Sequence, residues 1–485
     1  MIMSHSSQII FGPLTTIVLL KFIMNKKIIP LFLASFFTAS SAHAAINLIA
    51  IGEINANYQD LSARTSGPLE SGVPGNILGG MGSGLAYAGG NTFIATPDRG
   101  PNANPYNSLV DDTTSYICRF HTLDLSLAAN PNYNSAVVGS LPYILSPALT
   151  TTTLLSTPIP LTYAATGVPA LNKPAYNYFT GRSDNFDATK SSTNHQNGRL
   201  DPEGVRVSNN GKYVFISDEY GPYVYQFDRY SGRRLKKFNL PSYFAVNKLS
   251  SQGALEISGL GNTAGRIANK GMEGLAITPD GTTLVGMMQT ELLQDSKKYI
   301  RIVTIDIASG ATHEYAYKLT AGSGVSEILA ISNTEFLVLE RDGKGLGDNS
   351  TAAVKQLFKI DIAGATDVSG VTSIGGITTP LLTKTLFLDV VSALTAPAVG
   401  INAIDIPAKI ESVAFGPDIV VGSVTKHTLF LANDNDFLAT ITDSNHPNGI
   451  ANPNKFFVFT FESADLPTFV PQGITPYARD LHDRG

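Results

Sequence analysis

Hydrophobic and polar residues alternate with a period of two through residues 201–241, which predicts four antiparallel strands in a row. The second strand is a continuous apolar run, as expected of a strand that is buried on both faces, and the fourth is polar enough to lie at an edge. The strands are VRVS (205–208), YVFIS (213–217), YVYQFDRY (223–230) and RLKKFNL (234–240). Four short antiparallel strands joined by tight turns have the size of one β-propeller blade.

Partial copies of this pattern recur along the chain. Each copy has a polar or acidic start, an alternating strand, a turn, a hydrophobic strand and a second polar cluster; the copies lie at 82–100, 271–292, 325–345 and 410–437. With the first segment they make five, and the divergent stretch 105–200 is long enough to contain another blade. We therefore expect an all-β protein with a single β-propeller, favour six blades, and keep five and seven as alternatives.

The two ends of the repeat region are expected to meet. The run INLIAIGEI (46–54) and the run KFFVFTF (455–461) are both strand-like, and pairing them would close the ring and remove an exposed sheet edge. The stretch 125–200 is rich in Asn, Ser, Thr and Pro, which predicts a loop-rich insertion within the propeller domain.

The first 44 residues have the features of a targeting segment. Met24 is followed by Lys26 and Lys27, by an apolar run, and by Ala42-His43-Ala44, which together predict a secretory signal peptide cleaved after Ala44. Residues 1–23 are then an over-long start, although an uncleaved anchor is the alternative. We expect one mature propeller domain over residues 45–485 in the periplasm or outside the cell, with no stable membrane insertion.

Composition and net charge exclude some classes of binding partner. The 485 residues are 43% hydrophobic and 15% charged, which suits a folded core. Removing residues 1–44 lowers the basic count from 34 to 31 against 39 acidic residues, so the mature chain has a formal charge of −8. This charge argues against nucleic-acid binding. The single cysteine, Cys118, excludes an intramolecular disulfide, and we expect a monomer.

The repeat places carboxylates on one face of the propeller. In an antiparallel pair the start of the first strand lies beside the end of the second, so Glu203 and the pair Asp218-Glu219 share one rim. Because the other copies repeat this arrangement, we expect a ring of acids around the mouth of the central channel. The candidate metal ligands are Asp98, Glu203, Glu273, Glu291, Glu327, Glu340, Glu411 and Asp434.

So many carboxylates in one funnel repel each other unless they are protonated, paired with arginine or bound to a cation. The available arginines are Arg99, Arg206 and Arg341. Oxygen ligands without cysteine favour Ca²⁺ over zinc or copper, so calcium is the expected cofactor. The alternative is that each acid only fixes its own turn.

Six segments of this sequence resemble the phytase-like family of secreted bacterial proteins, often described as having the esterase-like activity of phytase. They are ATPDRGPN (95–102), DPEGVRVSNNGKYVFISDEYGPYVYQFD (201–228), GMEGLAITPDG (271–281), LVLERDGKG (337–345), KIESVAFGPD (409–418) and LFLANDNDF (429–437). The resemblance implies a propeller that hydrolyses esters. The matching motif positions are Asp98, Arg99, Glu203, Asp218, Glu219, Glu273, Glu340, Arg341 and Glu411.

Three functions are compatible with these observations. The first is a Ca²⁺-assisted hydrolase of small phosphate esters, in which Asp218 or Glu219 is the general base and Arg99, Arg206 or Arg341 neutralises the phosphate. The second is a Ca²⁺-dependent lactonase or carboxylic-ester hydrolase that uses the same face. The third is a non-catalytic binding propeller with structural calcium.

Overall fold

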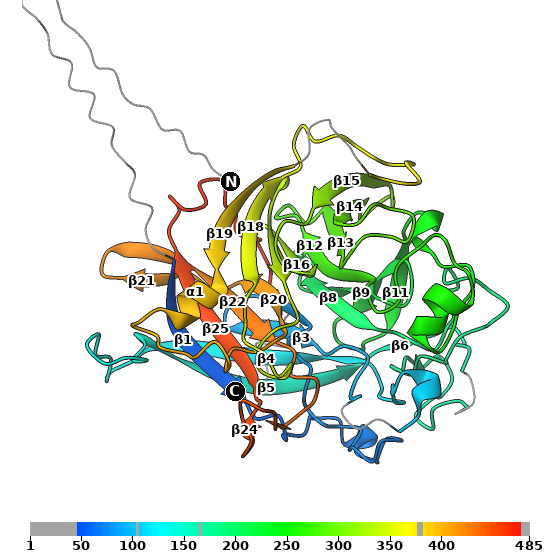
Figure 1. The fold of residues 1–485 in the computed structure, drawn as a ribbon, viewed down its shortest axis with the longest axis horizontal. Helices are drawn as coiled ribbons and strands as arrows, with labels where there is room; N and C mark the ends of the chain where they lie inside the picture. Colours follow the sequence, from blue (N-terminus) through cyan, green and yellow to red (C-terminus); the bar gives the residue numbers. More distant parts are fainter. Residues whose placement is uncertain (1–45, 103–105, 164–166, 376–381, 477–485) are drawn as a thin grey trace, which may run out of the picture. The chain divides into compact units, whose positions relative to one another are not determined.

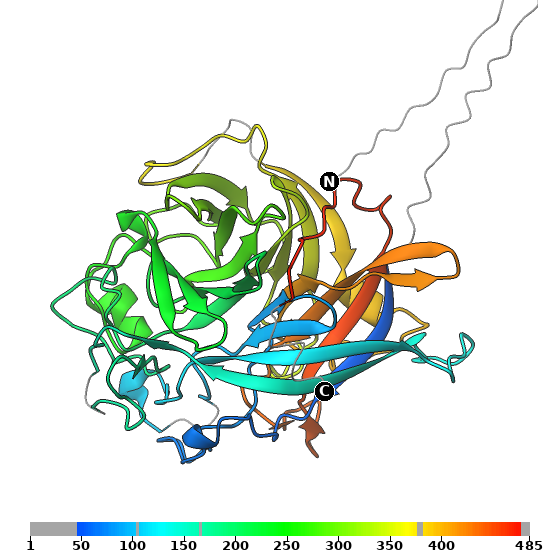
Figure 2. The same ribbon diagram turned by 180° about the vertical axis from the view of Figure 1, so that it is seen from behind.

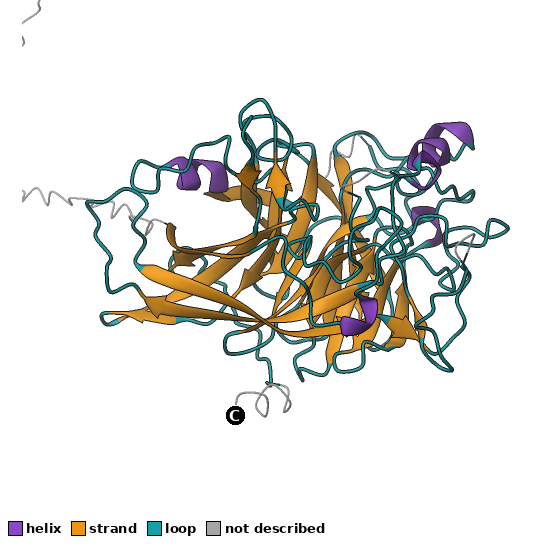
Figure 3. Cartoon of the chain, turned by 90° about the horizontal axis from the view of Figure 1, so that it is seen from below, coloured by secondary structure: helices purple, strands orange, loops and turns teal. Residues whose placement is uncertain are grey.

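The computed structural model describes residues 46–102, 106–163, 167–375 and 382–476. Strands dominate this part of the chain and helices are few and short (Figure 3). None of the helices in these ranges has the length and apolar content needed to cross a membrane. The predicted signal peptide, residues 1–44, lies outside the described residues.

Five antiparallel sheets, four of them with four successive strands, make up most of the described part of the chain (Figure 1). The four sheets that follow sequence order consist of β2 (Gly84–Tyr87), β3 (Thr92–Thr96), β4 (Arg119–Ala129) and β5 (Tyr143–Leu154); β8 (Pro202–Val207), β9 (Tyr213–Asp218), β10 (Tyr223–Asp228) and β11 (Arg234–Asn239); β12 (Met272–Ile277), β13 (Thr283–Met288), β14 (Tyr299–Asp306) and β15 (Thr312–Lys318); and β16 (Gly324–Ala330), β17 (Glu335–Arg341), β18 (Lys355–Asp361) and β19 (Thr383–Asp389). These sheets confirm the strands predicted over residues 201–241 and the blade starts predicted from the copies.

The fifth sheet joins the two ends of the propeller. Its strands, from the inside outwards, are β20 (Ile410–Phe415), β22 (Val424–Asn433), β25 (Asn454–Phe461) and β1 (Asn47–Ile54), and β21 (Ile419–Val421) forms a hairpin with β22. Antiparallel pairing of β1 with β25 places Asn47 opposite Thr460 and Ile54 opposite Asn454. The predicted closure by the terminal strands is therefore confirmed.

The innermost strands form a closed ring. Each of β2, β8, β12, β16 and β20 contacts the next, and β20 contacts β2. The propeller thus has five blades in the described residues, one fewer than the number we favoured from the sequence. The stretch expected to contain a sixth blade instead supplies the long strands β4 and β5, which complete the first blade and form the extended hairpin seen in Figure 2.

Apolar side chains fill the spaces between neighbouring blades. Separate clusters of buried residues connect the fifth blade to the first, the first to the second, and the fourth to the fifth, and one larger cluster spans the second, third and fourth blades. Cys118 is buried in the cluster between the first and second blades. Because each sheet buries both faces, the hydrophobic middle strands detected in the sequence are largely buried, and the innermost strands β8, β12 and β16 are buried along their whole length.

The remaining elements are short and lie in the connections. Two small hairpins pair β6 (Ser156–Thr157) with β7 (Asn177–Tyr178) and β23 (Thr440–Ile441) with β24 (Ile450–Ala451). The helical segments are α1 (Val390–Thr395), the 3₁₀ turns η1 (Ala63–Thr65), η2 (Ser108–Val110) and η3 (Ser242–Phe244), and the π-helical turn η4 (Leu255–Gly259). The loop-rich part of the predicted insertion begins after Leu154, since β4 and β5 occupy its first part.

Candidate functional site

A β-bulge near the start of the inner strand presents one residue from each of four blades to the same channel mouth. The pairing with the second strand shifts after Pro202, Met272, Val325 and Ile410. An extra residue at such a bulge is free to redirect its side chain. The residues just after these shifts, Glu203, Glu273, Ser326 and Glu411, form the first ring, and Ser83 precedes β2 in the remaining blade.

A second ring comes from the end of the second strand of each blade, at or just after its last register partner. Its members are Asp98, Glu219, Gln289, Arg341 and Asp434. Contacts between the rings show that they meet: the Nε2 of Gln289 donates to Glu273 at 2.9 Å, and the guanidinium of Arg341 pairs with Glu411. The Nη2 of Arg341 also lies 3.8 Å from Glu273.

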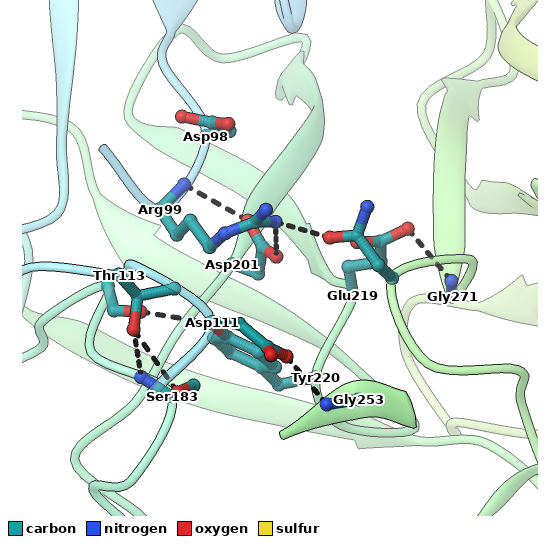
Figure 4. Close-up of polar contacts among 12 residues, drawn as sticks. Asp98, Arg99, Asp111, Thr113, Ser183, Asp201, Glu219, Tyr220, Gly253 and Gly271 are labelled. Atoms are coloured by element: carbon teal, nitrogen blue, oxygen red, sulfur yellow. Dashed lines mark hydrogen bonds and ion pairs between the residues drawn. The ribbon is translucent and has the colours of Figure 1, made fainter. Parts of the chain in front are cut away.

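Asp201, Glu203 and Glu219 form the tightest acidic group in this mouth. One carboxylate oxygen from each lies within 4.8 Å of the others, and all three residues are buried. The backbone N–H and the Nη1 of Arg99 donate to the two oxygens of Asp201 at 3.0 and 2.9 Å, and the Gly271 N–H donates to Glu219 at 3.0 Å (Figure 4). Three hard oxygen ligands at this spacing suit a divalent cation such as Ca²⁺.

The opposite side of the mouth has its own counter-ion. The ammonium of Lys409 contacts Asp434 at 3.0 Å and Asp436 at 2.5 Å. Asp434 also accepts a hydrogen bond from the Asp436 N–H at 2.7 Å. This side is therefore largely neutralised by lysine and backbone, in contrast to the group around Glu203.

Burial and mutual repulsion shift the acids toward their protonated forms. Burial, followed by the charges of Glu273 and Asp201, raises the pKa of Glu203 well above its usual range. Burial raises the pKa of Glu219 to about 7, with Asp201 adding to the shift, and burial also raises the pKa of Glu411 to about 7 against the opposing effect of Arg341. Such a cluster either takes up protons near neutral pH or is stabilised by a bound cation.

Arg206 and Glu327, two of the predicted site residues, lie away from this mouth. The Nη2 of Arg206 pairs with Glu327 at 3.0 Å, and its guanidinium donates to the carbonyl oxygens of Leu85 and Ile328 at 2.9 and 2.8 Å. These carbonyls belong to inner strands of different blades, so Arg206 spans the channel. It also lines a cavity of about 330 Å³ at the other end, beside Phe469 and Gln472.

The register explains the position of Glu327. The residue after the register shift in its strand is Ser326, so Glu327 occupies the next position, which is glycine at Gly204 and Gly274. A Cβ atom at Gly204 would come within 2.5 Å of the Leu275 backbone nitrogen, and one at Gly274 within 2.8 Å of that of Ile328. Glycine follows the glutamate in those two blades because neighbouring inner strands approach so closely there.

The structure also separates Glu340, Asp218 and Glu291 from the two rings. Glu340 accepts hydrogen bonds from the Tyr317 hydroxyl at 2.5 Å and the Ala321 N–H at 2.6 Å and pairs with Lys384. Asp218 accepts from the N–H groups of Asp201 and Tyr220 at 3.2 and 3.0 Å. Successive strand residues point to opposite faces, which is why Glu219 and Arg341 face the mouth while the acids before them do not.

Glu291 lies in the loop after β13, where it accepts a hydrogen bond from the Lys298 N–H at 3.5 Å. The ring position in that blade belongs to Gln289, which the sequence did not identify because its side chain is uncharged. Asp201 and Lys409 were also missed. Asp201 stands two residues before Glu203 in the DPEG motif, and Lys409 stands two residues before Glu411. A search for polar residues immediately before each inner strand would have found both.

Comparisons with known proteins give one curated relative and several distant structures. An uncharacterised secreted protein of Arthroderma benhamiae is 32% identical over 177 residues, which cover 30% of this chain and 34% of the relative. The chain therefore spans about a third of that protein's length.

Among solved structures, a periplasmic gluconolactonase of Pseudomonas aeruginosa is 10% identical with a TM-score of 0.32, covering 85% of this chain and 99% of that one. A putative 6-phosphogluconolactonase of Bacteroides uniformis is 12% identical with a TM-score of 0.28, covering 78% and 88%. We draw no functional conclusion from similarities this distant.

The family match covers most of the propeller. Residues 76–437 match the family described as "Phytase-like: Esterase-like activity of phytase". This range includes both rings and the acidic group around Glu203. The chain therefore belongs to the phytase-like family, which confirms the resemblance found in the sequence.

Proposed function

We propose that the protein is a secreted, divalent-cation-dependent ester hydrolase that acts at the acidic channel mouth, with small phosphate esters as its first expected substrates. The observation that carries the proposal is the convergence of Asp201, Glu203 and Glu219 within 4.8 Å in a buried position. The family description, which names an esterase-like activity, supports hydrolysis. The secreted relative supports a location outside the cytoplasm.

The residues at the mouth fit a cation better than they fit a purely structural role. Burial raises the pKa of Glu203 most, and the charges that add to this shift are carboxylates, Glu273 first among them. The described structure brings no lysine or arginine into an ion pair with Glu203. Asp201, Glu203 and Glu219 would hold the ion. A bound divalent cation supplies Lewis acidity for the ester group and makes water more acidic.

Side chains of the protein would bind the substrate anion and accept the proton from the attacking water. Arg99, anchored by Asp201, can donate hydrogen bonds to an anionic oxygen of the substrate. Glu273 is the carboxylate placed beside Glu203 to accept a proton from the attacking water, and the Nε2 of Gln289 fixes one of its oxygens. Asp218, Arg206 and Glu340 are excluded from these tasks because their side chains are engaged elsewhere.

The test is a substrate panel on the purified protein. p-Nitrophenyl phosphate, p-nitrophenyl acetate and a simple lactone are assayed with Ca²⁺, with EDTA, and with Ca²⁺ restored, using wild type and Glu203→Gln. We expect phosphate release that EDTA abolishes, that Ca²⁺ restores, and that Glu203→Gln lowers by roughly 100-fold or more.

Each outcome separates the three functions. Turnover of the acetate ester or the lactone without phosphate release would identify a carboxylic-ester hydrolase. Stabilisation by Ca²⁺ without turnover of any substrate would identify a binding propeller. Full activity in EDTA would contradict the cation-dependent mechanism.

A further inference from the structure

A cavity of about 250 Å³, lined largely by charged and hydroxyl-bearing residues, lies directly beside the acidic group. Its walls come from loops that precede or follow the blade strands, including the segments around Thr113, Ser183, Ser251 and Arg266. Hydrogen bonds fix these loops to one another: Ser251 donates to the Leu109 carbonyl at 2.7 Å, and the Ser183 N–H donates to Thr113 at 2.8 Å. The cavity is therefore a formed feature of the loops.

Arg99 belongs to both the cavity and the acidic group. Its Nη1 donates to Asp201 at 2.9 Å and to the side-chain oxygen of Asn269, a cavity residue, at 2.5 Å. Figure 4 shows Arg99 between Asp98, Asp201 and Glu219 on one side and Thr113, Ser183 and Tyr220 on the other. A molecule in the cavity would thus lie within reach of the carboxylates that we propose to hold a cation.

Three guanidinium groups converge on the cavity from an otherwise acidic face, and Arg99 among them is also paired with Asp201. Arg99, Arg199 and Arg266 line it, against Asp111 and Glu256. Glu256 is engaged by Arg266 at 2.6 Å, and Asp111 accepts a hydrogen bond from the Gly253 N–H at 2.6 Å. Both acids are therefore occupied by groups of the protein itself.

Arg199 is the least satisfied of the three arginines. It is 4% exposed, its Nη1 donates to the Ser183 carbonyl at 2.9 Å, and its guanidinium stacks on the Phe186 and Tyr220 rings at 4.6 and 4.7 Å. Its Nη2 makes no hydrogen bond to any described residue and is 3.9 Å from Glu256. A buried guanidinium with an unused donor is a suitable partner for a ligand anion.

We propose that this cavity binds the anionic group of a small polar molecule, a phosphate or a carboxylate, and holds that molecule beside Asp201, Glu203 and Glu219. Arg199 and Arg99 are the expected donors to the anion. The inference rests on the proposed function only in taking this molecule to be the substrate; binding itself requires no hydrolysis.

The experiment measures binding in EDTA, where no cation-dependent turnover occurs. The full chain is titrated by calorimetry with glycerol 1-phosphate, glycerate and glycerol, which share a polyol and differ in the anionic group. We expect at least one anion to bind roughly tenfold or more tightly than glycerol. Preference for glycerol 1-phosphate would assign the cavity to phosphate, and preference for glycerate would assign it to carboxylate.

Two variants locate the binding. Ala268→Leu fills the cavity without removing a charge, and Arg199→Gln removes the guanidinium; each should weaken the preferred anion by roughly tenfold. Ala264→Leu, in the same loop but outside the cavity lining, is the matched control and should bind as wild type. The proposal is overturned if neither anion binds more tightly than glycerol, or if Ala268→Leu binds as wild type.

Glu203→Gln separates this proposal from the proposed function. This variant should keep anion binding while it loses hydrolysis, because Glu203 does not line the cavity. Lost binding with intact hydrolysis in Ala268→Leu would instead show that the cavity holds an anion unrelated to the reaction.

Discussion

Glu203 and Glu327 lie near the starts of equivalent inner strands, yet they occupy opposite environments. Glu203 faces the channel mouth, where other carboxylates dominate its surroundings. Glu327 lies one register position further into its strand and is held by Arg206 at 3.0 Å and by the N–H groups of Leu275 and Ile328 at 3.1 and 3.0 Å. A single step in register therefore separates an under-compensated acid, suited to a ligand, from an acid whose partners are supplied by the fold.

The contrast between Glu203 and Glu327 suggests where a ligand binds, because a carboxylate without an ion-pair partner from the chain is available to a cation. Buried charges normally receive partners from the chain itself. Arg206 and Glu327, which we call the channel waist, pair with each other through Nη2 and Oε1, although Glu327 Oε2 has no partner among the described residues. The mouth around Glu203 retains several carboxylates whose repulsion costs stability unless protons or a cation compensate for it. Natural proteins keep such costs mainly at functional sites.

The largest expected effect is at the waist. Arg206→Met leaves Glu327 buried without its cation, so we expect the free energy of unfolding to fall by about 3–5 kcal/mol. Urea denaturation measures the loss. Glu203→Gln at the mouth is the comparison variant, and it should cost far less because Glu203 has no ion-pair partner among the described residues to leave behind. An equal loss in both variants would contradict the distinction between the regions.

The next effect concerns catalysis, and here the mouth should be more sensitive than the waist. Glu203→Gln should lower kcat/KM for the best ester by roughly 100-fold, whereas Glu327→Gln should stay within a few-fold of wild type. Initial rates in Ca²⁺ give the comparison, with circular dichroism to confirm that both variants fold. Comparable losses of activity in the two variants would place the chemistry elsewhere.

The rise in Tm on adding Ca²⁺ should depend on the acids at the mouth and not on Glu327 at the waist. At a Ca²⁺ concentration of about 100 times the Kd, binding to the folded state adds about 2.7 kcal/mol, so the Tm should rise. Asp201→Asn should remove most of this rise, since it takes away one ligand of the acidic group, whereas Glu327→Gln should keep it. A full Ca²⁺ response in Asp201→Asn would rule out this group as the binding site.

The smallest effect is a pH dependence at the waist. Burial raises the pKa of Glu327 from 4.5 to about 7, although Arg206 opposes the shift. Because the folded state holds this proton more tightly than the unfolded state, its contribution to stability is lost as pH rises between these values. The slope is at most about 1.4 kcal/mol per pH unit.

Urea denaturation in EDTA across this pH range tests the sign. Stability should decline less steeply with rising pH in Glu327→Gln than in wild type. Added Ca²⁺ should reduce the part of the pH dependence of stability that comes from the acids at the mouth. The difference in pH dependence between wild type and Glu327→Gln should stay unchanged. Identical slopes for Glu327→Gln and wild type would show that Glu327 does not titrate as expected.

The sequence predicted the fold class well because the blade pattern is local. Alternation, the continuous apolar run and the turns between them lie within about forty residues, and each depends on neighbours in the chain. The pairing of β1 with β25 was also predictable, since an unpaired edge strand at either end needs a partner. The blade number was not, because residues 119–154 complete a blade with long strands that lack the repeat's pattern.

For the site, the sequence by itself determined that acids gather at one channel mouth. It correctly brought together Asp98, Glu203, Glu219, Glu273, Arg341, Glu411 and Asp434, because antiparallel pairing follows directly from the strand order. Tertiary structure decided which residue at each blade faces the mouth, since bulges set the register of four of the inner strands and the second strands alternate between their two faces. It also placed Arg206 at the waist and joined Arg99 to the cavity beside the acidic group, because those contacts connect different blades and loops that no local pattern relates.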